Sequence, residues 1–353
     1  MRLRLMGFAV AAAIGLVGVA EFYAMTPQPK HEPPVPPPHL DRIVIIVLEN
    51  YRSGKVDPSA IGSEQLSPFL NKLARENRFA MNYFGVWSPS LPNYIAMIGG
   101  DFFDVSNNAD SCFNPDHQKS CNGFDAPNLV DQLEEAHIAW EGLFESMPSA
   151  GFLGTRFPAD SKLYAQKHNP FVYFKSIALD PTRLAQLKPF VLGELKAELA
   201  DPVSASRLIF LVPNLCHDQH GTLGCKPAAV TLAAGDAFLA ETVPAIVNAP
   251  AFTERSVLFI AWDNSNGREA CCGAWRGGGR IPLIAVTRHA VAVRGTTPSD
   301  HYSLLATIED GFGLPRLANA KGAATLFDLF PDFADKRDTQ TSGGADDPAS
   351  LSH

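Results

Sequence analysis

The sequence predicts an α/β fold with a doubly wound, mostly parallel sheet and helices on both of its faces. Apolar runs of strand length alternate along the chain with amphipathic helical windows. Within these runs the apolar residues are consecutive rather than alternating, as in strands that are buried on both faces. The chain has 353 residues, of which 46% are hydrophobic and 19% charged, and this suffices for one large core.

The expected elements follow one another in the order that such a fold needs. The first strand covers residues 42–48, RIVIIVL. A helix follows over 67–76, because Ser67 and Pro68 suit a helix start and the apolar residues after them share one face. The later elements are helices at about 127–137 and 183–199, strands at 208–212, 256–262 and 281–286, and a helix at 302–312.

The two ends of the chain differ from this middle part. In residues 1–20, Arg2 and Arg4 precede an uncharged apolar run, which is the layout of a secretory signal peptide. The run is shorter than the roughly 20 residues of a comfortable bilayer span. We therefore expect cleavage, no stable membrane span in the mature protein, and a periplasmic or secreted domain. The alternative is an uncleaved N-terminal anchor.

Composition divides the remaining chain into three parts. Residues 21–40 are rich in proline and are expected to form a stiff linker. Residues 41–333 form the expected folded domain. Residues 334–353 are polar and are expected to be disordered.

Six cysteines are present, at positions 112, 121, 216, 225, 271 and 272. In an oxidising compartment we expect the first two to form one disulfide and the next two another. Six cysteines allow 15 pairings, so this pairing is a hypothesis, and zinc binding is its alternative, although no CxxC pair exists. The adjacent third pair is expected not to bond internally, because such a bridge strains the chain.

The formal net charge is -8. An acidic surface argues against a partner that is held by charge alone, such as nucleic acid or an anionic membrane. It leaves open the binding of a single phosphate group in a local pocket.

Polar residues follow three of the predicted buried strands. Glu49 and Asn50 follow the first, Asn214 follows the strand at 208–212, and Asp263 and Asn264 follow the strand at 256–262. The carboxyl ends of parallel strands meet at one edge of the sheet, where ligands bind in such folds. Each residue alone fits a turn or cap, but together they indicate a site with oxygen ligands.

Ser90 lies at the expected start of a helix, since Pro92 suits a first helical turn. The first backbone N–H groups and the positive end of the helix dipole favour an anion there. A phosphate held at this position has the Ser90 hydroxyl beside its phosphorus. The alternative is that Ser90 only caps the helix.

Histidines occur in three further segments. Asp218 and His220 lie in a polar loop after the strand at 208–212, and His301 begins the last helix. His168 and Asn169 precede a proline. Imidazole and carboxylate groups are common ligands of divalent ions. The alternatives are a polar surface loop and structural histidines.

These segments together resemble the phosphoesterase family of bacterial acid phosphatases and phospholipases C, within the alkaline-phosphatase-like superfamily. The matching motifs occur in the order of the family. They are VLEN at 47–50, PSLPNY at 89–94, HNPF at 168–171, VPNLC at 212–216 with Asp218 and His220, WD at 262–263, and HYSLL with TIED at 301–310.

The resemblance implies an alkaline-phosphatase-like fold and a hydrolase of phosphoric esters. It favours an acid-phosphatase-like phosphomonoesterase with a phosphoseryl intermediate and one or two divalent metal ions of unknown identity; the alternative is a phospholipase C or another phosphodiesterase. The implied residues are, as catalytic groups, Ser90, His168 and His301; for substrate binding, Asn50, Asn93, Asn169 and His220; and as metal ligands, Glu49, Asn50, Ser90, Asp218, Asp263 and Asn264.

One departure concerns the metal. Many relatives carry an acidic pair after the tryptophan, whereas this chain has Asp263 and Asn264. The loss of one charge leaves the number of ions open.

Two other classes of protein fit the sequence less well. A non-enzymatic envelope protein with a decayed site is one, but Ser90 and Asp263 are both retained. A Ser-His-Asp esterase is the other, but the Gly-x-Ser-x-Gly motif of its nucleophile elbow is missing from the sequence.

Overall fold

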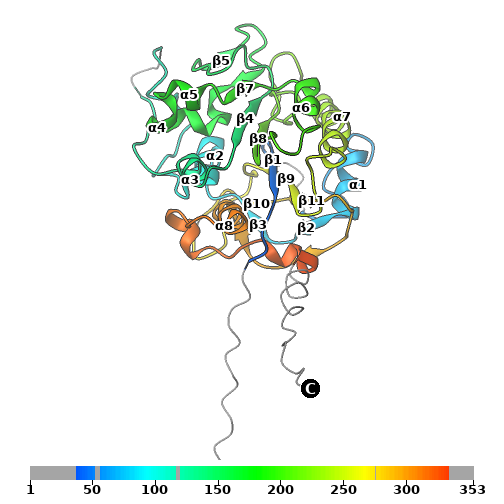
Figure 1. The fold of residues 1–353 in the computed structure, drawn as a ribbon. Coiled ribbons are helices and arrows are strands. Elements are labelled where there is room, and N and C mark those ends of the chain that lie inside the picture. The colour runs from blue at the N-terminus through cyan, green and yellow to red at the C-terminus, as the bar shows by residue number, and fades with distance from the viewer. Residues whose placement is uncertain (1–36, 52–55, 117–119, 275, 334–353) are drawn as a thin grey trace, which may run out of the picture. The chain divides into compact units, whose positions relative to one another are not determined.

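A computed structural model describes residues 37–51, 56–116, 120–274 and 276–333 (Figure 1). The predictions of a signal peptide at 1–20, of most of the linker at 21–40 and of a tail at 334–353 lie outside the described residues. The sheet and helices below all belong to the predicted domain.

The central sheet has eight strands and is mostly parallel, as predicted. The strands are, in spatial order, β12 (Arg294–Gly295), β2 (Arg78–Ala80), β11 (Leu283–Val286), β9 (Ser256–Trp262), β1 (Arg42–Leu48), β8 (Leu208–Val212), β4 (Trp140–Phe144) and β7 (Leu187–Pro189). Among them, β11 runs antiparallel to both of its neighbours, β9 and β2.

Strand β1 lies between β8 and β9 and runs parallel to both. All seven of its residues are buried, as the unbroken apolar run predicts. Its last residue, Leu48, pairs with Trp262, the last residue of β9. The two strands therefore end level with each other, and the residues that follow them leave the sheet at the same edge.

Helices flank the sheet on both sides (Figure 1), which confirms the predicted class. One group is α1 (Pro68–Glu76), α6 (Leu192–Glu198) and α7 (Ala228–Val247), and the other is α2 (Ser90–Gly99), α3 (Leu129–Glu135) and α8 (His301–Phe312). The short helices α4 (Lys175–Ala178) and α5 (Pro181–Leu184) lie near α3. By length and composition α7 could cross a membrane, but 44% of its most apolar window is buried in the fold.

The prediction of one helix over 183–199 is wrong. The segment contains α5, strand β7 and helix α6. Leu187 pairs in parallel with Gly142 of β4, so β7 forms an edge of the sheet. Pro189 lacks a backbone donor, which an edge strand tolerates and a helix interior does not.

The disulfides match two of the three expectations about cysteines. Cys112 bonds to Cys121, and Cys216 bonds to Cys225. The expectation for the adjacent pair is wrong, because Cys271 and Cys272 are also bonded to each other. The backbone turns sharply there, with a φ of 62° at Cys272.

Candidate active site

Three loops meet at the edge of the sheet where β1 ends. The Glu49 backbone N–H donates to the carbonyl of Asp218 at 2.7 Å, and the Asp263 N–H donates to that of Leu48 at 2.9 Å. The Asn50 N–H donates to the Asp263 carboxylate at 2.7 Å. Backbone bonds thus hold the predicted acidic residues together.

Ser90 is the first residue of α2, and Pro89 is its N-cap. The Ser90 hydroxyl is only 2% exposed and donates to Glu49 Oε2 at 2.9 Å. The hydroxyl thus contacts the carboxylate that follows β1 and makes no cap bond, so Ser90 is not the cap of α2.

Asn93 holds the segment that leads to Ser90. Its Oδ1 accepts from the backbone N–H groups of Val86 and Trp87 at 2.9 and 3.2 Å. Its Nδ2 donates to the carbonyls of Trp87 and Pro89 at 2.9 and 3.0 Å. The amide is therefore engaged with the backbone on both sides of Pro89, next to Ser90.

Lys167 is a site residue that the sequence reasoning missed. It lies in the short 3-10 helix η1 (Gln166–His168), and its side chain is 10% exposed. Its Nζ lies 3.3 Å from Ser90 Oγ, 3.4 Å from His220 Nε2 and 3.9 Å from Glu49 Oε2. The adjacent HNPF motif locates the segment, but only the fold shows that this ammonium points at the serine.

His168 lies between two of the acidic residues. Its Nε2 is 3.1 Å from Glu49 Oε1, and its Nδ1 is 3.4 Å from Asp218 Oδ2. The ring stacks on Tyr94 of α2 with centroids 5.1 Å apart. Burial outweighs the nearby Glu49 charge and lowers the pKa of His168 to about 4, so the imidazole is neutral near pH 7.

His220 lies on the loop that the Cys216–Cys225 disulfide closes. Its backbone N–H donates to Asp218 Oδ1 at 2.7 Å. Its Nδ1 lies 2.8 Å from the carbonyl of Gly221 and is the donor in that contact. The other nitrogen, Nε2, therefore carries the lone pair that faces Lys167.

Two predicted residues lie behind the site. His301 Nε2 contacts the Asp263 carbonyl at 2.6 Å, and its Nδ1 contacts the Tyr83 hydroxyl at 2.9 Å. Both ring nitrogens are thus engaged, and burial lowers the pKa of His301 to about 4. Asn169 is fully buried and donates to the Tyr164 hydroxyl at 3.3 Å.

The remaining geometry favours a cation. Two buried oxygens, Asp263 Oδ2 and Asn264 Oδ1, have no hydrogen-bond partner among the described residues. Two more, Glu49 Oε1 and Asp218 Oδ2, are contacted by the His168 ring at 3.1 and 3.4 Å. Burial and the charge of Glu49 raise the pKa values of Asp218 and Asp263 well above their ordinary range. Burial alone would raise the pKa of Glu49 as well. The nearby His168 and Lys167 outweigh burial, so the pKa of Glu49 lies below its ordinary value. Carboxylate and amide oxygens with this excess of negative charge fit a divalent metal ion.

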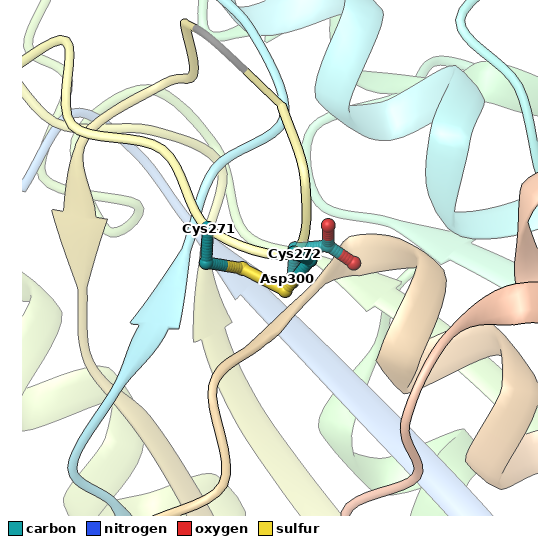
Figure 2. Close-up of side chains that lie close together, drawn as sticks. All are labelled: Cys271, Cys272 and Asp300. Atoms are coloured by element: carbon teal, nitrogen blue, oxygen red, sulfur yellow. A yellow bond between two sulfur atoms is a disulfide. The ribbon is translucent and has the colours of Figure 1, made fainter. Parts of the chain in front are cut away.

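In the described part of the chain, one group of His, Cys, Asp or Glu side chains is close enough together to hold a metal ion, and it does not include the residues near Ser90. Cys271, Cys272 and Asp300 bring one ligand atom each within 4.8 Å of one another (Figure 2). Both sulfurs are in the disulfide, so neither is a thiolate.

The fold with its polar edge is that of a known class of α/β proteins. A solved structure from Vibrio parahaemolyticus, a protein in the alkaline phosphatase superfamily, aligns with a TM-score of 0.51 and 12% identity. The alignment covers 81% of this chain and 72% of the other and shows the fold alone. At the level of sequence, the chain belongs to the Phosphoesterase family, whose model matches residues 62–315.

Two relatives illustrate this membership. The phosphate-repressible acid phosphatase of Penicillium chrysogenum is 31% identical over 299 residues, which are 83% of this chain and 64% of that protein. The phosphatidylinositol-3-phosphatase of Mycobacterium tuberculosis is 28% identical over 289 residues, 82% of this chain and 83% of that protein. The chain thus spans less than two thirds of the Penicillium protein. The family predicted from the motifs is confirmed.

Proposed function

We propose that this chain is an exported hydrolase of phosphoric esters, and specifically an acid-phosphatase-like phosphomonoesterase. The observation that best supports this proposal is the position of the Ser90 hydroxyl. It lies at the start of α2, 2.9 Å from the Glu49 carboxylate and 3.3 Å from the Lys167 ammonium. The names of the two relatives, both phosphatases, support the reaction class. Export rests on the signal-like residues 1–20, and the disulfides suit an oxidising compartment.

The first task of the site is to receive an anion. Ser90 lies at the start of α2, where the positive end of the helix dipole favours a phosphate. The Lys167 ammonium adds a full positive charge on the same side as the nucleophile. Positioning and charge neutralisation are the main contributions to phosphoryl transfer.

The second task is to transfer the phosphoryl group. Ser90 Oγ bonds to phosphorus while its proton passes to Glu49 Oε2, and the bond from phosphorus to the alcohol oxygen breaks. The alcohol leaves with a proton from the Lys167 and His220 pair, whose nitrogens lie 3.4 Å apart. Water then attacks the phosphoserine and gives one proton to the Lys167 and His220 pair. The bond from phosphorus to Ser90 Oγ breaks, Glu49 returns its proton to Oγ, and inorganic phosphate leaves.

The buried oxygens of Glu49, Asp218, Asp263 and Asn264 would hold a divalent ion. When bound, such an ion supplies a Lewis acid that neutralises charge on a phosphate oxygen. The Asn50 N–H orients the Asp263 carboxylate.

Three of the sequence-predicted residues take positioning roles in this proposal. His301 orients the backbone of Asp263 through its carbonyl. Asn93 fixes the segment before Ser90. Asn169, which follows His168 in the HNPF motif, donates to the Tyr164 hydroxyl and so anchors that segment.

The decisive experiment compares Ser90→Ala with Ser88→Ala, which removes an exposed hydroxyl two residues away. Release of phosphate from an aryl phosphate should fall at least roughly 10³-fold in the first variant and stay near wild type in the second. Acid quenching with a ³²P-labelled ester should label wild type at Ser90. Equal turnover of Ser90→Ala and wild type would remove the serine from the mechanism. Faster hydrolysis of a phosphocholine diester than of the monoester would favour the phosphodiesterase alternative.

A further inference from the structure

We propose that the Lys167 ammonium is a built-in cation of the catalytic centre and restricts it to one divalent metal ion. This inference rests on the proposed function and specifies the metal content of the same site. It addresses the number of ions, which the sequence leaves open because Asn264 follows Asp263.

The contacts of Lys167 occupy the position that a second ion would need. Its Nζ lies 3.3 to 3.9 Å from a serine hydroxyl, an imidazole nitrogen and a carboxylate oxygen, those of Ser90, His220 and Glu49. All three are donor types that bind divalent ions, at about 2.0 to 2.6 Å. An ion bridging them would have to displace the ammonium.

The backbone under Lys167 is anchored. The side chain of the preceding residue, Gln166, accepts from the Ser111 N–H at 2.9 Å and donates to the carbonyl of Leu153. The Asn169 N–H closes the 3-10 turn on the Gln166 carbonyl at 2.8 Å. The ammonium therefore projects from a fixed base and belongs to the site.

The two oxygens of Glu49 separate the ammonium from the expected metal position. Oε2 accepts from Ser90 and faces Lys167. Oε1 points away from Lys167 to His168, whose Nε2 lies 3.1 Å from it and whose Nδ1 lies 3.4 Å from Asp218 Oδ2. Glu49 thus faces the Lys167 ammonium with Oε2, while Oε1 would bind the divalent ion.

Charge repulsion adds to the steric obstacle that the ammonium presents to a second ion. A second divalent ion placed among Ser90, His220 and Glu49 would lie directly beside the Lys167 ammonium, and two cations at that separation repel each other.

The test is a count of ions in the full chain after removal of metal by a chelator. Zn²⁺ and Mn²⁺ are titrated by calorimetry, and bound metal is measured by elemental analysis after gel filtration. We expect one ion per chain in wild type. Lys167→Met should bind the first ion roughly tenfold more tightly, because a neighbouring positive charge is lost. Lys188→Met, which removes the partner of Glu141, is the matched control and should leave the affinity unchanged.

Two ions bound with comparable affinity by wild type, or no ion, would overturn the inference. So would a Lys167→Met variant whose affinity is unchanged or weakened. If that variant does not fold, as judged by circular dichroism, the wild-type count decides alone. Hydrolysis of an aryl phosphate is measured in the same wild-type samples. Activity with two ions contradicts only this inference, whereas one ion without activity contradicts only the proposed function.

Discussion

Two buried aspartates, Asp236 and Asp263, differ in how many of their carboxylate oxygens accept hydrogen bonds. Asp236 of α7 is 7% exposed, and its two carboxylate oxygens accept the backbone N–H groups of Phe69 and Leu70 at 3.2 and 2.7 Å. Asp263 after β9 is fully buried. One of its oxygens accepts the Asn50 N–H, and the other has no partner in the described chain.

The difference separates structure from function. The Asp236 carboxylate caps α1 from a distant helix, and both of its oxygens are used. Asp263 has one oxygen without a hydrogen-bond partner among the described residues. Burial and the nearby charge of Glu49 raise the pKa of Asp263. A buried acceptor without a partner costs folding free energy. For Asp263, the proposed metal ion would complete this acceptor.

The largest expected effect is that of Asp263→Asn. Phosphate release should fall roughly 10³-fold, because the variant loses a charge that holds the metal ion. In chelator at pH 8, the free energy of unfolding should instead rise by about 1 kcal/mol, since a buried repulsion with Glu49 is removed. Steady-state kinetics and urea unfolding measure the two quantities. If the variant is active and less stable than wild type, Asp263 has a structural role like that of Asp236 and is not a metal ligand.

Removal of the metal should have the next largest effect. A ligand at 100 times its Kd stabilises the folded state by about 2.7 kcal/mol, so a chelator should lower the Tm of wild type. Asp236→Ala should show the same chelator-dependent shift, and Asp263→Asn should show little. Differential scanning calorimetry with and without Mn²⁺ tests this, and an identical shift in all three proteins would refute the assignment of Asp263 as a ligand.

The third prediction concerns the structural member of the pair. Asp236→Ala should lower the free energy of unfolding by about 1 kcal/mol, because the start of α1 loses its cap. Activity with an aryl phosphate should be retained. Ser67→Ala is the control, since Ser67 precedes α1 but its side chain makes no cap bond in the described structure. It should change stability by less than about 0.5 kcal/mol. A larger loss from Ser67→Ala than from Asp236→Ala would reverse the assignment of the cap.

The sequence predicted the parts of the site that depend on parallel strand order. Buried strands leave their terminal residues at one edge, so Glu49 and Asp263 were expected together, and the register of β1 with β9 explains why. The capping role of Asp300 at α8 was also predictable from local sequence, and its side chain accepts from Tyr302 and Ser303.

Other features depend on contacts between distant segments and could not be read locally. Lys167 reaches Ser90 across 77 residues, and Asp236 reaches Leu70 across 166. The strand at Leu187–Pro189 exists because β4 offers a free edge, which overrides a helical pattern in the sequence. The direction of a side chain and the position of a sheet edge depend on contacts between segments far apart in the sequence, so local sequence patterns do not predict them.

The smallest expected effect extends the comparison to a third buried acid. Glu309 of α8 is fully buried, and one of its oxygens accepts the Leu317 N–H at 2.8 Å. The other oxygen has no partner among the described residues, as in Asp263. Burial raises the pKa of Glu309 to about 8. The arrangement lies on a helix away from the proposed metal ligands and has no proposed ligand to complete it.

The pH dependence of stability follows from that shift. Between its ordinary pKa of about 4.3 and about 8, Glu309 holds a proton in the folded state that the unfolded state releases. The contribution of Glu309 to the free energy of unfolding therefore falls as pH rises through this window. Glu309→Gln should flatten that fall, and its advantage over wild type should grow from pH 5 to pH 8. Urea unfolding at four pH values measures the slope. Parallel slopes in the two proteins would mean that Glu309 is ionised in the fold and that an unpartnered buried oxygen alone does not distinguish such groups.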